Sequence, residues 1–150
     1  MNPSLTFDPS DGSASISGIP IRLRGGLSRE AVPSALVSFY RSTLNHGNGY
    51  EWLSFHGVTF GGHPCGFALC FFHGSMTQLH FSVMLPNTEI ESGWPTKGAI
   101  DDEIAFVRKE LSAQLRTTIA DHGSTFSWGV AWSTFDPRGF QASSGVRYTG

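Results

Sequence analysis

The sequence predicts an α+β domain that spans residues 1–150, with two helices packed on one face of an antiparallel sheet. Three apolar runs separated by short glycine-containing segments indicate a central three-stranded meander over about 50–85. Apolar residues at helical spacing indicate helices over about 32–44 and 99–121. Alternation of apolar and small residues late in the chain indicates a C-terminal hairpin over about 125–148.

Size and composition fit one folded domain without attraction to nucleic acid. The chain of 150 residues can bury its own core, and 13% aromatic residues are too many for a disordered chain. A formal net charge of −2 gives no overall electrostatic attraction to nucleic acid or to an anionic membrane surface. We see no apolar run of about 18 residues and no signal-peptide pattern. Cys65 and Cys70 would point to opposite faces of one strand, so we expect reduced thiols and a cytoplasmic protein.

The segment before the meander is expected to contain two short strands and the first helix. Ser13 to Ile16 and Ile19 to Leu23 have strand-like patterns, with turn-forming residues before them. Ser28 is a candidate helix N-cap, and Pro33 is tolerated only near a helix start. The helix should then continue to Leu44. Its buried stripe would consist of Val32, Leu36, Phe39 and Tyr40.

The turns of the meander predict its register. Gly61-Gly62 and Gly74-Ser75 suit two-residue hairpin loops, which would place Phe60 opposite His63 and His73 opposite Met76. One face, expected to pack under a helix, would carry Leu53, Phe55, Gly66, Ala68, Cys70, Phe72, Leu79, Phe81, Val83 and Leu85. The other, which we call the mixed face, would carry Trp52, Ser54, His56, Val58, Phe60, Cys65, Phe67, Leu69, Phe71, Gln78, His80, Ser82 and Met84.

The last third of the chain is expected to supply the long helix and a second hairpin. The helix should bury Ile100, Ile104, Val107, Leu111, Leu115 and Ile119 and end at a cap near Gly123. In the hairpin, Pro137-Arg138-Gly139 suits a three-residue turn. That turn would pair Val130 with Val146, and it would bury Trp128 and Trp132.

No pattern in the sequence carries catalysis or metal binding. Cys65 and His73 share a face of the predicted strand but lie eight residues apart, about 26 Å at 3.3 Å per residue. Ser54 and His80 are separated by a strand, and there is no Gly-x-Ser-x-Gly motif. Glycine-rich phosphate loops are also missing. We therefore expect no catalytic residue, no metal and no cofactor.

The order of elements resembles a family pattern. Gly18-Ile19-Pro20-Ile21 near the start, Trp128-Gly129 in the penultimate strand and Phe135-Asp136 at its end resemble small bacterial proteins of unknown function. Several such groups look like immunity proteins of polymorphic-toxin and contact-dependent systems. The resemblance implies a non-catalytic protein that binds and neutralises a cognate toxin.

Such a partner would need an aromatic anchor cluster, and the mixed face offers one. The candidate partner-binding residues are Trp52, His56, Phe67, Phe71 and His80 on that face and Trp94 in a loop. Either the chain itself covers the mixed face or a partner does. Two alternatives remain open: a small-molecule pocket or active site between the meander and the long helix, and a homodimer that uses the mixed face.

Overall fold

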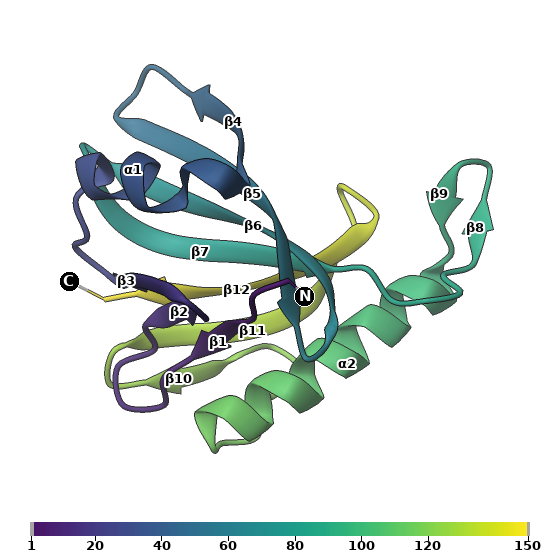
Figure 1. Cartoon of the computed structure of the whole chain (residues 1–150). Coiled ribbons are helices and arrows are strands. Elements are labelled where there is room, and N and C mark those ends of the chain that lie inside the picture. Colours follow the sequence, from purple (N-terminus) through teal and green to yellow (C-terminus); the bar gives the residue numbers. More distant parts are fainter. Residues whose placement is uncertain (1, 150) are drawn as a thin grey trace.

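The computed structural model describes residues 2–149 and has the α+β fold that the sequence predicts (Figure 1). The helices are α1 (Val32–Leu36) and α2 (Lys97–Leu115), with 3₁₀ turns at η1 (Arg29–Ala31) and η2 (Val37–Phe39). The strands are β1 (Leu5–Phe7), β2 (Ala14–Ile16), β3 (Ile19–Leu23), β4 (Tyr40–Asn45), β5 (Tyr50–Phe60), β6 (His63–Phe72), β7 (Ser75–Val83), β8 (Ile90–Glu91), β9 (Trp94–Pro95), β10 (Ser124–Phe126), β11 (Gly129–Asp136) and β12 (Gln141–Tyr148).

The strands form one large antiparallel sheet and two small ones. The large sheet has the order β10-β11-β12-β7-β6-β5-β4, and its β5-β6-β7 part is the predicted meander. Strand β12 lies between β11 and β7, so it joins the C-terminal hairpin to the meander. Strands β1 to β3 form a separate sheet, and β8 and β9 form a small hairpin that projects near the start of α2 (Figure 1).

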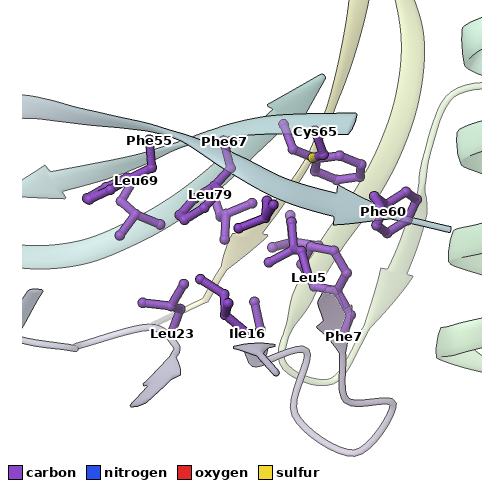
Figure 2. Packing of buried hydrophobic residues seen from close by; sticks show 14 of the residues in the cluster. Leu5, Phe7, Ile16, Leu23, Phe55, Phe60, Cys65, Phe67, Leu69 and Leu79 are labelled. Carbon is purple, nitrogen blue, oxygen red and sulfur yellow. The ribbon is translucent and has the colours of Figure 1, made fainter. Parts of the chain in front are cut away.

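The large sheet has one covered face, which we call the inner face. Leu53, Leu69, Leu79 and Val146 lie side by side on it across β5, β6, β7 and β12, and all four are buried. The β1–β3 sheet packs against this row with Leu5, Ile16 and Leu23, as Figure 2 shows. Helices α1 and α2 contribute to the same core, which confirms the prediction that the helices share one face.

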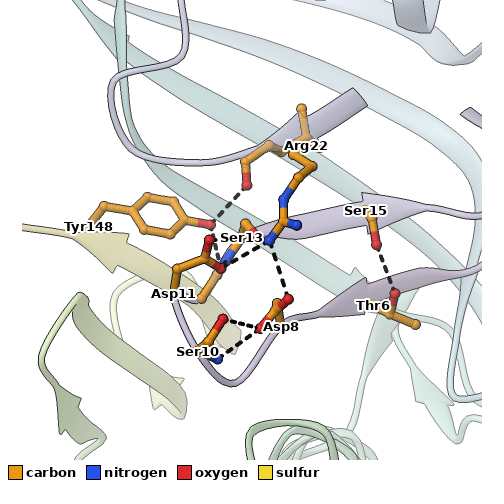
Figure 3. Close-up of polar contacts among 10 residues, drawn as sticks. Thr6, Asp8, Ser10, Asp11, Ser13, Ser15, Arg22 and Tyr148 are labelled. Atoms are coloured by element: carbon orange, nitrogen blue, oxygen red, sulfur yellow. Dashed lines mark hydrogen bonds and ion pairs between the residues drawn. The ribbon is translucent and has the colours of Figure 1, made fainter. Parts of the chain in front are cut away.

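The β1–β3 sheet is tied to the end of β12 by polar contacts (Figure 3). The Tyr148 hydroxyl donates to the Gly12 carbonyl at 2.8 Å. Nearby, Arg22 donates to Ser13 Oγ at 2.6 Å and pairs with Asp8 and Asp11. The pairs are exposed, so we expect little stability from them. The contact between β12 and the small sheet is therefore the one made by Tyr148.

The predicted register of β5 and β6 is right at the turn and wrong beyond it. Phe60 lies opposite His63, as expected, but a β-bulge between Phe55 and Val58 shifts the pairing. The extra residue places Phe55 opposite Phe67. The apolar residues of β6 therefore share the inner face with those of β5, and the mixed face as predicted does not exist.

The turn at the other end of β6 lies one residue earlier than predicted, and a β-bulge between Cys70 and Phe71 then shifts the pairing of β6 with β7. The loop is His73-Gly74, with Phe72 opposite Ser75. Both loop residues have positive φ, 49° and 80°, which a type I′ turn requires and which histidine tolerates better than most residues.

The register of the C-terminal hairpin is also one residue away from the prediction. Gln141 lies opposite Asp136, so the loop has four residues, and Val130 faces Arg147 instead of Val146. The loop places Phe140 in the left-handed region at φ 47°. The longer loop puts Ala131 and Ser133 on the inner face and turns Trp132 to the opposite side.

The first helix is much shorter than predicted. Helix α1 ends at Leu36, and the segment expected to complete it forms β4 instead. Val32 and Leu36 are buried as expected, but Tyr40 is exposed. Pairing with β5 satisfies the backbone groups on one side of β4, and this contact overrides the helical spacing of the apolar residues.

Helix α2 begins two residues earlier and ends six residues earlier than the helix predicted over about 99–121. Thr96 caps it by accepting a hydrogen bond from the Ala99 amide at 3.1 Å. Arg116 closes it in the left-handed conformation, so Gly123 is not the cap. No helix of residues 2–149 combines the length and apolarity needed to cross a membrane.

Candidate functional site

Three aromatic side chains meet at the centre of the outer face, the side of the large sheet opposite the core. Trp52 comes from β5, His80 from β7 and Trp132 from β11. The ring centroid of His80 lies 4.8 Å from that of Trp52 and 5.2 Å from that of Trp132, both edge-to-face. All three are half-buried. We call them the aromatic cluster.

Small residues on the strands between make the cluster possible. Ala68 and Gly145 flank His80 on the two neighbouring strands, so the tryptophans can reach it from two strands away. A Cβ atom at Gly145 would lie 3.1 Å from ring atoms of both His80 and Trp132, and 2.5 Å from the Leu79 carbonyl oxygen. Glycine is therefore required under the rings.

Two polar atoms of the cluster have hydrogen-bond partners within the chain. His80 Nε2 lies 2.8 Å from Gln78 Oε1, and because an amide oxygen accepts, Nε2 carries the proton. Trp132 Nε1 donates to Ser143 Oγ at 3.1 Å. The ring surfaces that remain exposed are thus available for apolar contact.

Burial lowers the pKa of His80 below its usual 6.5. In the unfolded chain His80 binds a proton near pH 6.5, whereas in the folded chain it stays neutral at that pH. His80 should therefore lower the free energy of unfolding as the pH falls below 6.5. We expect the free energy of unfolding to fall between pH 7.5 and about 5 more steeply for the native protein than for His80→Phe. Urea unfolding at each pH measures the difference, and parallel profiles would contradict it.

The apolar surface continues from the cluster to the β4 edge of the sheet. Leu44 lies opposite Trp52, and Tyr50 lies opposite Phe72 with 4.6 Å between ring centroids. Leu44, Tyr50 and Phe72 are exposed. Large exposed apolar side chains gathered at one end of a sheet are typical of an interaction surface.

One hollow adjoins the cluster at His80, and a second lies farther along the sheet. The first, about 490 Å³, is of mixed polarity, and its lining includes Arg41, Ser54, Phe67, His80, Ser82, Asp136 and Gln141. The second, about 620 Å³, is more apolar and lies between the end of the meander and the first turns of α2. Its lining includes His56, Cys65, Met84, Ile90, Ile100 and Glu103. This groove lies where the alternative small-molecule function would place a pocket.

Cys65 and Glu103 are two buried ionisable groups that line the groove. Burial raises the pKa of the Cys65 thiol to about 12, so it is not a thiolate at neutral pH. Burial also raises the pKa of Glu103, whose Oε2 accepts a hydrogen bond from the Val83 amide at 3.1 Å. Among residues 2–149, no three His, Cys, Asp or Glu side chains are close enough to hold a metal ion.

The structure separates the six candidate residues. It brings Trp52 and His80 together, whereas Phe67 and Phe71 are 3% and 0% exposed in the core. His56 is exposed in the β5 bulge and lines the groove. Trp94 is 50% exposed on the β8–β9 hairpin.

Sequence reasoning missed Trp132, which it assigned to the core because of the assumed hairpin loop. An isolated glycine in a strand pattern, such as Gly57 at φ 91°, is the signal that could have revealed the β5 bulge. No comparable signal marks the hairpin loop, since its left-handed residue is Phe140 and not the adjacent Gly139.

The architecture defines an α+β fold with a seven-stranded antiparallel sheet covered on its inner face. No protein-family model and no curated protein matches the sequence. A similar fold occurs in a chain of the solved complex of Rhs1-CT with its cognate immunity protein RhsI1. The match covers 96% of this chain and 86% of that chain, with a TM-score of 0.54 and 13% sequence identity. At 13% sequence identity, this likeness shows a shared fold.

Proposed function

We propose that this protein is an immunity protein that binds a bacterial protein toxin through the outer face of its large sheet and neutralises it. The observation that carries the proposal is the aromatic cluster of Trp52, His80 and Trp132 on that face. The likeness of 96% of the chain to a chain of a toxin–immunity complex supports the choice of partner.

The cluster has the properties of a binding anchor. Tryptophan is enriched among the residues that dominate binding energy, and such residues lie near the centre of an interface. The edge-to-face packing against His80 fixes the tryptophan rings before the partner arrives, so little side-chain entropy remains to be lost. The exposed Leu44, Tyr50 and Phe72 would widen the apolar contact.

The hollow beside the cluster would complete the interface. The polar part of its lining consists of Arg41, Asp136 and Gln141 together with Ser54, Ser82 and Ser143. Polar groups around an apolar centre give hydrogen bonds and orientation without requiring a buried charge pair. We expect a protruding segment of the toxin to enter this hollow.

Co-expression tests the function. A bacterial host would carry the toxin domain encoded beside the gene of this protein, with or without the protein itself, and colony counts would be compared. We expect survival only with the protein, and co-purification of the two chains. An unrelated toxin domain is the control and should kill the host in either case. Equal killing by the neighbouring toxin with and without the protein would refute the proposal.

A further inference from the structure

Strand β4 is an open edge of the large sheet. All six of its residues, Tyr40–Asn45, are exposed, and among the described residues only β5 pairs with it. The opposite edge differs, because β10 has only three residues. Natural proteins protect edge strands with proline, charged side chains, β-bulges or extreme shortness. In β4 the bulge and the charged Arg41 lie at its start, and Ser42–Asn45 has none of these features.

The outward-facing backbone groups of β4 follow from its ladder with β5. The His46 amide donates to the Tyr50 carbonyl at 3.1 Å, which continues the ladder one residue beyond the strand. Antiparallel pairs alternate between hydrogen-bonded and non-hydrogen-bonded positions. Leu44 therefore directs its backbone groups to β5, and Thr43 and Asn45 direct theirs outward.

The regular part of this edge is symmetric about Leu44. A register shift between Tyr40 and Ser42 ends the regular ladder on one side, so the run extends from Ser42 to His46. Two copies of that run, paired antiparallel about a two-fold axis through Leu44, would bring Thr43 of each copy opposite Asn45 of the other. Both positions have N–H and C=O groups that point outward, so Thr43 of each copy and Asn45 of the other can exchange two backbone hydrogen bonds.

Side chains fit the same arrangement. An axis perpendicular to the sheet keeps the outer faces of both copies on one side. The Leu44 side chain, 58% exposed, would meet its own copy and extend the apolar row that it forms with Trp52. Arg41 is the one formally charged residue of β4, and its two copies would stand about 20 Å apart at 3.3 Å per residue, so they would not repel.

We propose that two copies of this protein associate through β4, with Leu44 paired against Leu44 of the second copy, to form one continuous fourteen-stranded sheet. This inference does not depend on the proposed toxin partner. The site differs from the mixed face that a homodimer was first expected to use. Since the pairing involves few residues, the dimer should be weak and depend on protein concentration.

Disulfide trapping tests the register. Leu44 would occupy a non-hydrogen-bonded pair, where Cα atoms lie about 4.5 Å apart, within disulfide range. We expect Leu44→Cys to form a covalent dimer under mild oxidation at least about tenfold faster than Met84→Cys, because pairing raises the local thiol concentration. Met84 is 70% exposed and far from the proposed axis, and the native Cys65 and Cys70 are buried. Equal rates for the two variants would overturn the register.

Sedimentation tests the association itself. The native protein should show a monomer–dimer equilibrium up to about 1 mM, and Thr43→Pro should remain monomeric, since proline removes an outward N–H that β5 does not use. If Thr43→Pro does not fold, Leu44→Glu serves as the second variant, because the dimer would place the two glutamates opposite each other at the axis. A native protein that stays monomeric at every concentration refutes the proposal. No toxin enters these measurements, so their failure is distinct from failure of the proposed function.

Discussion

Replacing Trp52 with alanine is expected to lower the affinity for the toxin at least about 30-fold. Central aromatic anchors of interfaces contribute about 2 kcal/mol or more, and 1.4 kcal/mol corresponds to a tenfold change in Kd. The substitution also removes the ring that packs on His80 at 4.8 Å, so the cluster loses its order before binding. Isothermal titration calorimetry with the purified toxin domain measures the change.

Trp94→Ala is the matched control for this prediction. Trp94 is exposed on the β8–β9 hairpin, outside the aromatic cluster, and its indole donates to the Phe140 carbonyl at 2.7 Å. We expect its loss to change Kd less than about fivefold, as for most residues outside the centre of an interface. A large loss for Trp94→Ala with little change for Trp52→Ala would move the binding surface to the hairpin and the adjoining groove.

Replacing Phe67 with alanine is expected to reduce the free energy of unfolding by about 3–5 kcal/mol, the usual cost of removing a buried phenylalanine. Phe67 is 3% exposed and stacks on Phe55 at 5.0 Å between ring centroids. Its loss would leave a cavity between the meander and the β1–β3 sheet (Figure 2). Urea unfolding measures the effect.

Phe72→Ala provides the comparison with the same chemical change. Phe72 belongs to the same strand but is exposed on the outer face, so its removal should cost less than about 1 kcal/mol of stability. Toxin affinity of folded Phe67→Ala should stay near the native value. If Phe67→Ala kept full stability and lost binding, Phe67 would be a contact residue and the assignment of faces would be wrong.

The position of the meander could be predicted from sequence because its turns have strong local signals. Gly61 and Gly62 both adopt positive φ, and the pairing of Phe60 with His63 follows from them. Which residues share a face could not be predicted to the same degree, because strand side chains alternate with a period of two and one extra residue inverts all that follow. The β5 bulge between Phe55 and Val58 and the β6 bulge between Cys70 and Phe71 each supply such a shift.

Only part of the candidate site could be predicted from sequence, because register shifts decide which residues share a face. The predicted register places Trp52 of β5 and His80 of β7 on the same face. The two bulges shift β6 by one residue against each neighbouring strand, so Trp52 and His80 still share a face, whereas the residues of β6 change sides. Phe67 and Phe71 were therefore exchanged for Ala68 and Cys70 on the outer face. Whether Tyr40–Asn45 forms helix or strand is decided by hairpin pairing with the next strand, β5, which the helical spacing of the apolar residues does not encode.

The place of β12 in the sheet has a consequence for how the protein is made. The β4–β7 and β10–β11 parts of the sheet join only when residues 141–148 insert between β11 and β7. A ribosome synthesises the chain in order, so the meander must wait with an unpaired β7 edge until β12 emerges. The unpaired β7 edge can accept wrong partners during this interval, and chaperones that shield exposed strand edges should protect it.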